Sequence, residues 1–222
     1  MLGDKVAVFV DVQNAFYSAR SAYGGKLNYS RMLEGVVGDR KLVRAIAYIV
    51  QRPNVKQSGF HEALSKIGFE LKVTEVKDKN SNGKIVPVKG NYSIRLTIDA
   101  LNIASKVDTV ILISGGGEYI PLVCDLQSKG VRVEIFGFDG STSGGLIKSS
   151  NYYKTVPPEW ILESKGDSRK EPREEKIVID PDDPDLISYD EEYDEDDEDD
   201  VDYEDDGQPQ VKGQPSPMGM FE

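Results

Sequence analysis

Two acidic residues follow apolar segments of the chain, at positions where α/β proteins often carry out chemistry. Asp11 ends the β-branched run KVAVFVD at residues 5–11, and Glu118 follows the three glycines of ILISGGGE at residues 111–118. Carboxylates at strand ends can hold Mg2+ or Mn2+, and they can equally cap the helix that follows, here one beginning near Asn14. Asp11 is therefore the best single candidate for a functional acid, with helix capping as the alternative.

The consecutive glycines offer a second kind of site. A strand, a glycine-rich turn and a helix start present backbone N–H groups that suit a phosphate. The residues concerned are Ser114, Gly115, Gly116 and Gly117. Their pattern matches neither the P-loop nor the dinucleotide-binding glycine motif. Phosphate binding is therefore a weakly supported interpretation of this turn.

Strand-like and helix-like segments alternate along the part of the chain that carries these residues. Nearly continuous apolar strands separated by helices are typical of a parallel sheet covered on both faces. We therefore predict a doubly wound α/β domain, a three-layer sandwich with a mostly parallel sheet of about five strands. If its first strand is central, the ends of that strand and of the strand before the glycines face each other across the ligand-binding crevice. The predicted strands are residues 5–11, 41–51, 69–77, 108–114 and 131–137, with an edge strand at 152–156; the predicted helices are 14–25, 29–38, 58–68, 91–107, 118–129 and 141–150.

Two segments have more specific predictions. The helix at residues 91–107 has apolar residues at spacings of three and four, which predicts one apolar face. The polar segment 77–90 is predicted to be a hairpin or loop. The predicted helix face consists of Ile94, Ile98, Leu101 and Ala104.

Charge divides the chain into two parts. Residues 1–166 hold 22 Lys and Arg against 16 Asp and Glu, a net charge of +6, whereas residues 167–222 hold 5 against 23, a net charge of −18. So acidic a segment cannot bury enough apolar surface to offset the entropy of ordering it. We predict a folded domain at residues 1–160 and a disordered acidic tail at residues 161–222.

Targeting signals and membrane segments are not predicted. The chain has one cysteine, no signal-peptide pattern, and no apolar run of the roughly 20 residues needed to span a bilayer. These features predict a cytoplasmic protein that does not enter a membrane.

Several ordered segments together resemble the NYN domains, specifically the LabA-like branch of the PIN-like nucleases. The segments are VFVDVQNAFYSAR, AIAYIVQ, KGNYSIRLTIDAL, ILISGGGEYIPLV, KGVRVEIFGF and STSGGLIKSS, which cover roughly residues 5–156. The resemblance implies a PIN-like α/β sandwich and Mg2+- or Mn2+-dependent cleavage of RNA.

The resemblance also implies four acidic site positions, and this chain keeps only part of that set. Asp11 is retained at the first position. Ser93 stands at the second, beside Tyr92 in place of a tryptophan. In the turn, Gly116 replaces one aspartate, and Glu118 replaces the other while keeping its charge.

Two further residues lie outside this set. Asn151 stands where the family usually has an aspartate after the last helix. Asp99 is six positions beyond Ser93 on the same predicted helix, which places it about 9 Å further along the axis. Asp99 is a second-tier catalytic candidate, with a structural or solvated helix position as the alternative. His61, the only histidine, is predicted to be a bystander.

The ligands expected from these residues are a metal ion and a nucleic acid. Asp11 and Glu118 are predicted to hold one Mg2+ or Mn2+ weakly, with Asn14 as a further catalytic candidate. Basic side chains near the site would contact phosphates, and aromatic ones would stack on bases of a single strand. The basic residues are Lys89, Arg95, Lys148 and Arg20, and the aromatic residues are Tyr17 and Tyr92. Ordinary surface charges and core-edge aromatics are the alternative.

The leading hypothesis is an NYN protein that binds RNA or another phosphate-bearing ligand, with nuclease activity weakened or lost. A working endoribonuclease that uses Asp11, Glu118 and Asp99 is the first alternative. The second is a scaffold protein whose acidic tail recruits a basic protein partner. The tail also has two other interpretations, a competitor for the nucleic-acid groove and a solubilising extension.

Overall fold

The computed structural model describes residues 4–51, 57–75, 91–162, 177–179 and 187–189. Its main feature is a six-stranded sheet with the order β4-β3-β1-β5-β6-β7, in which every neighbouring pair is parallel. The strand β1 is central, and β5 lies directly beside it, so the ends of these two strands are neighbours, as a ligand-binding crevice between them requires. The strands are β1 (Lys5–Asp11), β3 (Lys41–Gln51), β4 (Glu70–Glu75), β5 (Thr109–Ile113), β6 (Arg132–Gly137) and β7 (Tyr152–Thr155). The predicted α/β sandwich is confirmed.

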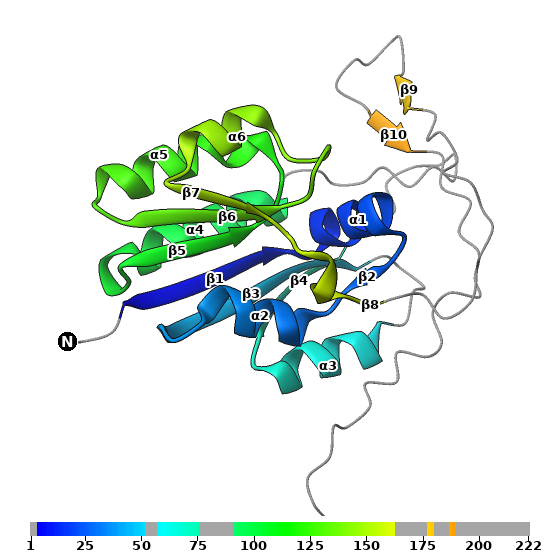
Figure 1. The fold of residues 1–222 in the computed structure, drawn as a ribbon, viewed down its shortest axis with the longest axis horizontal. Helices are drawn as coiled ribbons and strands as arrows, with labels where there is room; N and C mark the ends of the chain where they lie inside the picture. Colours follow the sequence, from blue (N-terminus) through cyan, green and yellow to red (C-terminus); the bar gives the residue numbers. More distant parts are fainter. Residues whose placement is uncertain (1–3, 52–56, 76–90, 163–176, 180–186, 190–222) are drawn as a thin grey trace, which may run out of the picture. The chain divides into compact units, whose positions relative to one another are not determined.

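Helices cover both faces of this sheet (Figure 1). Three of them pack on one face: α1 (Val12–Tyr23), α2 (Tyr29–Val37) and α3 (Ser58–Ile67). The other face carries α4 (Asn91–Ile103), α5 (Ile120–Ser128) and α6 (Gly144–Ser149), together with the short 3-10 helices η1 (Ala104–Lys106) and η2 (Gly117–Tyr119). None of the helices in the described part of the chain is long and apolar enough to cross a membrane.

Alternation along β1 decides which way its terminal acid points. Val6, Val8 and Val10 belong to the core on the α1 side, whereas Ala7 and Phe9 belong to the core on the α4 side. Successive side chains of a strand point to opposite faces, so Asp11 continues the second series. The carboxyl group therefore faces the layer that holds α4, α5 and η2.

The first helix begins earlier than its sequence predicted. Asp11 is the N-cap of α1, with extended backbone, and its side chain accepts the N–H of Asn14. The helix thus starts at Val12 rather than near Asn14. The capping role considered for Asp11 is present, in addition to its position at the strand end. The next helix, α2, is capped by Asn28 as expected.

The predicted apolar face of α4 is only half correct. Ile94 and Ile98 are 59% and 53% exposed, whereas Leu96, Ala100 and Ile103 are buried against the sheet. Both sets recur at helical spacing, so periodicity alone does not choose between them. The contact with β1 and β3 decides which stripe is buried.

The chain after β7 packs back onto the domain. The segment η3 (Pro158–Trp160) leads into β8 (Ile161–Leu162), which pairs antiparallel with β2 (Lys26–Leu27). A Cβ atom at Gly35 of α2 would collide with the Trp160 ring, so this strap lies directly on the helix. The fold therefore continues to Leu162, beyond the boundary predicted at residue 160.

Parts of the predicted tail and loop fall outside the described residues. Two short strands within the predicted tail, β9 (Ile177–Ile179) and β10 (Ile187–Tyr189), pair antiparallel. The rest of residues 163–222 and the predicted loop at 77–90, including Lys89, lie outside the described residues.

Candidate functional site

Asp11 is the centre of the candidate site and is almost completely buried, with 1% of its surface exposed. Its Oδ1 accepts the backbone N–H of Asn14 at 3.0 Å. Its Oδ2 accepts two hydroxyl groups, from Tyr119 at 3.1 Å and from Ser114 at 3.4 Å. Both carboxylate oxygens are therefore bonded within the protein, as a buried acid requires.

Burial raises the pKa of Asp11 to about 6. The hydrogen bonds from Asn14, Tyr119 and Ser114 favour the charged form and oppose this rise, while the nearby charge of Glu118 adds to it. Burial likewise raises the pKa of Tyr119, so its phenol stays protonated and remains a donor.

Hydrogen bonds inside the protein fix the glycine turn between β5 and η2. The side-chain oxygen of Asn14 accepts the N–H of Gly115 at 2.8 Å, and Ser114 Oγ accepts the N–H of Gly116 at 3.2 Å. The carbonyl of Gly115 accepts the N–H of Ser143 at 2.9 Å. These two glycine N–H groups are already bonded within the chain, which counts against the turn as a phosphate cradle.

Gly115 has a steric reason to be glycine. A Cβ atom there would lie 2.6 Å from the carbonyl oxygen of Ser141, a backbone atom that cannot rotate away. The turn after β5 and the turn after β6 therefore touch through this glycine.

Glu118 occupies the space beside Gly116. A Cβ atom built on Gly116 would lie 2.6 Å from the Cδ of Glu118, and it would also collide with the carboxylate oxygens. The Glu118 carboxyl group therefore folds back over Gly116. Because its side chain is exposed, it can move away when something else requires the space.

Tyr119 connects the remaining site residues, and the sequence analysis did not identify it. Its side chain is 0% exposed, and its hydroxyl is hydrogen-bonded to Ser93 as well as to Asp11. Ser93 thus lies next to Tyr119, in the first turn of α4. A tyrosine directly after the glycine turn was the available signal, because a buried phenol needs a hydrogen-bond partner.

Asp99 is paired with a different tyrosine. Tyr48 of β3 donates its hydroxyl to Asp99 Oδ2 at 2.8 Å. Tyr48 is opposite Asp11 in the β1–β3 register, and burial raises its pKa. The structure therefore assigns Asp99 to a contact between α4 and the sheet, in line with the structural role that was its alternative.

Asn151 lies at the opposite end of the sheet from Asp11. Its Oδ1 accepts the N–H of Val133 at 2.7 Å and the side-chain N–H of Gln127 at 3.1 Å. Val133 is near the start of β6, whereas the Asp11 site is at the strand ends. Asn151 therefore lies apart from the Asp11 site and joins β6, α5 and the start of β7.

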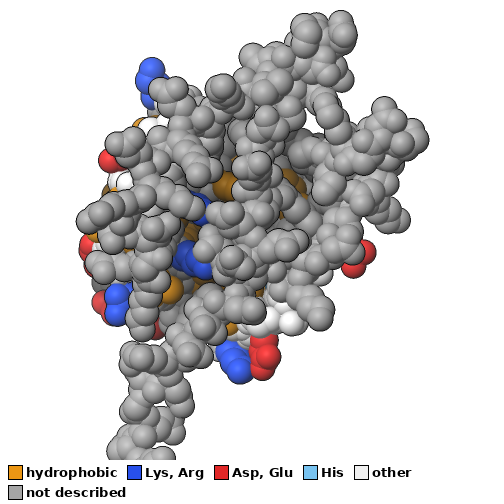
Figure 2. All heavy atoms as spheres, turned by 90° about the vertical axis from the view of Figure 1, so that its right-hand side faces the viewer, with side chains coloured by type: hydrophobic (Ala, Val, Ile, Leu, Met, Phe, Trp, Pro, Cys, Tyr) orange, Lys and Arg blue, Asp and Glu red, His pale blue; other side chains and the backbone are white. Residues whose placement is uncertain are grey.

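Helices around the glycine turn carry the predicted nucleic-acid contacts. Arg95 on α4, Lys148 on α6 and Arg20 on α1 are exposed. Tyr17 and Tyr92 are half-buried, and Tyr92 packs against the core on the α4 side. Figure 2 views the side toward which β1 points and shows Lys and Arg side chains beside hydrophobic ones among the described residues.

The donor set does not fit a divalent metal ion of the expected kind. Mg2+ prefers several oxygen ligands and keeps part of its water shell. Asp11 is buried with both oxygens engaged, and Glu118 is the other acid beside it. Within the described residues, no group of three or more His, Cys, Asp or Glu side chains is placed to share an ion.

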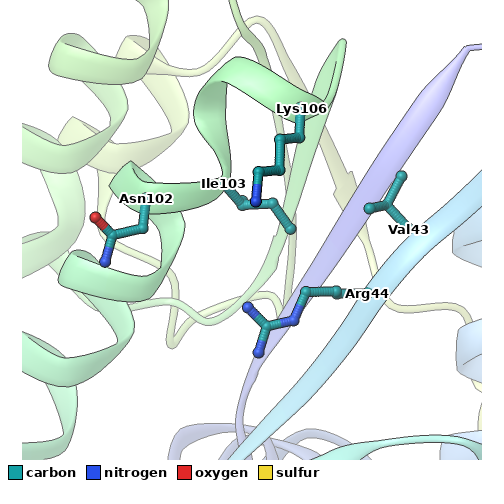
Figure 3. Close-up of a pocket in the computed structure, with 5 residues that line it drawn as sticks. All are labelled: Val43, Arg44, Asn102, Ile103 and Lys106. Carbon is teal, nitrogen blue, oxygen red and sulfur yellow. The ribbon is translucent and has the colours of Figure 1, made fainter.

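A separate pocket of about 260 Å3 lies between β3 and the end of α4 (Figure 3). Arg44 and Lys106 extend into it, and Val43, Asn102 and Ile103 complete its lining. Arg44 already forms a two-point ion pair with Glu70. Because Arg44 precedes Tyr48 by four residues of β3, the pocket is about 13 Å along the strand from the register of Asp11. It is not part of the candidate site.

Comparisons with known proteins relate the chain to one family and to a solved structure of the same fold. Residues 5–157 match the NYN domain family. The chain is 26% identical over 153 residues to the low amplitude and bright protein LabA of Synechococcus elongatus, covering 67% of this chain and 82% of that protein. A crystal structure of a protein of unknown function from Vibrio parahaemolyticus superposes with a TM-score of 0.65 at 30% identity, covering 72% of this chain and 98% of that one.

Proposed function

The chain belongs to the NYN domain family, and from this membership and the site geometry we propose that it binds RNA with its nuclease activity weakened or lost. The family relationship makes it a protein of the PIN-like nuclease class. The observation that carries the proposal is the hydrogen bond of Tyr119 to the buried Asp11. The acid retained at the first position of the site is bonded inside the protein, not presented to a ligand.

Phosphodiester cleavage needs more negative charge than this site offers. Metal-dependent nucleases activate water and stabilise the leaving oxygen with divalent ions, and those ions are held by carboxylates. Ser93 and Gly116 lack the carboxylates expected at their positions. Asp11 and Glu118 remain, and the buried Asp11 has a pKa of about 6. A loss of cleavage with retained binding is the outcome that this donor set favours.

RNA binding is supported by the charge and the exposed side chains of the domain. Residues 1–166 have a net charge of +6, and phosphate neutralisation supplies most of the affinity for nucleic acids. Arg95, Lys148 and Arg20 are exposed, so they can reach a phosphate backbone. Half-buried Tyr17 and Tyr92 offer ring surfaces for stacking on unpaired bases. Single-stranded RNA is therefore the proposed ligand.

The acidic segment is proposed to compete with RNA. A net charge of −18 on residues 167–222 acts as a tethered polyanion at high effective concentration. Competition of this type weakens RNA binding and makes it strongly dependent on salt. The same charge would also suit a basic protein partner.

The proposal is tested by RNA binding and cleavage with the full chain and with residues 1–166, with and without Mn2+, across a range of salt. We expect tighter binding after tail removal, no cleavage by either form, and an affinity that falls as salt rises. Absence of RNA binding by both forms at low salt would contradict the proposal. Stronger binding by the full chain than by residues 1–166 would contradict the competing role of the tail.

A working endoribonuclease is the second candidate, and one observation favours it. The carboxyl group of Glu118 lies beside Gly116 and is electrostatically coupled to Asp11, so a substitute acidic pair exists. RNA cleavage by the full chain that is lost in Asp11→Asn and in Glu118→Gln would establish this alternative. Capture of a basic protein by the full chain but not by residues 1–166, without RNA binding, would instead establish a scaffold.

A further inference from the structure

We propose that Tyr119 is the residue that keeps Asp11 from acting as a metal ligand, because its hydroxyl takes the place of a cation at Asp11 Oδ2. The inference rests on the proposed function, since it explains how cleavage is lost while the fold is kept. It identifies a positioning residue that acts through Asp11.

The hydrogen bonds around Asp11 leave little capacity for an ion. Oδ2 accepts the hydroxyl groups of Tyr119 and Ser114, and Oδ1 accepts the N–H of Asn14. A carboxylate oxygen has about two lone-pair positions, and both positions of Oδ2 already face a hydroxyl donor, with Tyr119 the nearer at 3.1 Å. Oδ2 is the carboxylate oxygen that faces η2, the short helix that contains Glu118.

Packing holds the Tyr119 hydroxyl in this position. The ring is 0% exposed and belongs to the core on the α4 side, so it cannot swing out to solvent as Glu118 can. The backbone N–H of Tyr119 donates to the carbonyl of Gly116 at 3.3 Å, which ties the residue to the glycine turn. Displacing the phenol would require the core around η2 to repack.

Hydroxyl groups occupy the places where a metal site needs charge. Ser93 lies on one side of the Tyr119 hydroxyl, and Ser114 lies beside it on Asp11. Hydrogen bonds from such groups stabilise a buried carboxylate without a cation. The surroundings of Asp11 are therefore those of a hydrogen-bonded centre, with hydroxyl groups from Tyr119 and Ser114 on its carboxylate.

Mn2+ binding tests this role directly and does not depend on RNA cleavage. The signal of free Mn2+ in electron paramagnetic resonance is measured during titration of the full chain and its variants. We expect Tyr119→Phe to bind Mn2+ at least about tenfold more tightly than the unchanged chain. Asp11→Asn in the Tyr119→Phe background should abolish the gain. An unchanged Mn2+ affinity in folded Tyr119→Phe would overturn the inference.

Tyr48→Phe is the matched control. It removes a phenol hydroxyl of the same kind from a carboxylate on the same side of the sheet, that of Asp99. We expect its Mn2+ affinity to equal that of the unchanged chain. An equal gain in both tyrosine variants would overturn the specific role of Tyr119.

Gly116→Asp keeps the inference testable if Tyr119→Phe does not fold, because it leaves Tyr119 in place. Gly116→Asp restores a carboxylate beside Asp11, and it requires only the exposed Glu118 side chain to move. With Tyr119 present, Gly116→Asp should bind Mn2+ no better than the unchanged chain, whereas Gly116→Asp with Tyr119→Phe should bind it at least about tenfold better. Tight binding by Gly116→Asp alone would overturn the inference.

RNA binding in the presence of a chelator separates this inference from the proposed function. If Tyr119→Phe gains Mn2+ affinity but the chain binds no RNA, the inference is supported and the proposed function is contradicted. RNA binding by all variants, without any gain of Mn2+ affinity in Tyr119→Phe, supports the proposed function and contradicts the inference.

Discussion

The carboxyl group of Glu118 lies against Gly116, in the space where a side chain at position 116 would begin. The two residues belong to one turn, and the longer acid reaches back over the glycine that precedes it by two positions. An acid is thereby kept near enough to Asp11 for their charges to interact. The turn also contains Gly115, which faces the backbone carbonyl of Ser141 instead of a movable side chain.

Gly115→Ala and Gly116→Ala should differ in stability. The new methyl at position 115 meets the backbone carbonyl of Ser141, so we expect a loss of about 1–3 kcal/mol. The methyl at position 116 meets only the movable end of Glu118, and the expected change is within about 0.5 kcal/mol. Urea unfolding of both variants measures the difference, and equal losses would contradict the assigned contacts.

Asp11 should make the free energy of unfolding depend on pH in a specific direction. Its pKa is about 6 in the folded chain against 3.8 for the ordinary group, so the folded state binds the extra proton between these values. This contribution is fully present below pH 3.8 and is lost as the pH rises through about 6. Its size is up to about 3 kcal/mol.

Asp11→Asn isolates that contribution from the many other acids of the chain. The free energy of unfolding of the unchanged chain, minus that of Asp11→Asn, should fall between pH 4 and pH 7. Urea titrations at several pH values measure this difference. A difference that stays constant or rises over this range would show that Asp11 does not have a raised pKa.

Tyr48→Phe should lower stability without affecting RNA affinity. The variant leaves Asp99 without its phenol donor, and the loss of one such hydrogen bond costs about 1–1.5 kcal/mol. Denaturant unfolding measures the cost, and fluorescence anisotropy with a single-stranded RNA measures affinity. A fall in RNA affinity, with stability unchanged, would contradict the structural role of the Tyr48–Asp99 pair and show that the pair contributes to RNA binding.

Glu134→Gln should destabilise the end of the sheet at which its parallel strands begin. Glu134 is 7% exposed and accepts Arg40 at 2.9 Å and Arg132 at 2.8 Å. Removing its charge weakens the contacts to Arg40, which keeps Asp4 at 3.7 Å, and to the half-exposed Arg132, at an expected cost of about 1–2 kcal/mol. Asp125→Asn breaks the exposed pair with Lys129 and is the control, with an expected cost below about 0.5 kcal/mol. Equal costs would rule out burial as the cause.

Lys148→Ala and Arg95→Ala should weaken RNA binding by the same factor for different RNA sequences. Each lost phosphate contact reduces the slope of log affinity against log salt by about 0.7 for a single strand. Lys66→Ala is the control, because Lys66 is on α3 on the opposite face of the sheet and pairs with Glu62. Anisotropy titrations at several salt concentrations give the slopes. A slope change in Lys66→Ala, with none in the other two variants, would contradict the prediction, because RNA would then bind the face of the sheet that carries α3.

The sequence predicted the sheet well because each strand carries its own signal. Runs such as KVAVFVD and KLVRAIAYIVQ contain at least five consecutive apolar residues, and buried parallel strands require such stretches. Helix ends coincide with residues of local backbone preference, such as Gly24 after α1 and Asn28 before α2. Asp11 was recognised for a similar local reason, since it ends a strand and begins a helix.

Other features depended on contacts between residues distant in the sequence, which local patterns do not encode. Tyr119 is separated from Asp11 by 108 positions, and nothing in the turn itself shows which group its hydroxyl meets. The exposed stripe of α4 is as apolar as its buried stripe, so only packing on the sheet distinguishes them.

The amino-acid sequence by itself thus determined the fold class and the family, because residue types and their order suffice for these. The tertiary structure decided what the retained acids do. Asp11 and Asp99 each meet a buried tyrosine hydroxyl, and these partners come together only when β1, β3, α4 and η2 are assembled. A carboxylate is the same group in either role, so its neighbours in space determine whether it is free to hold an ion.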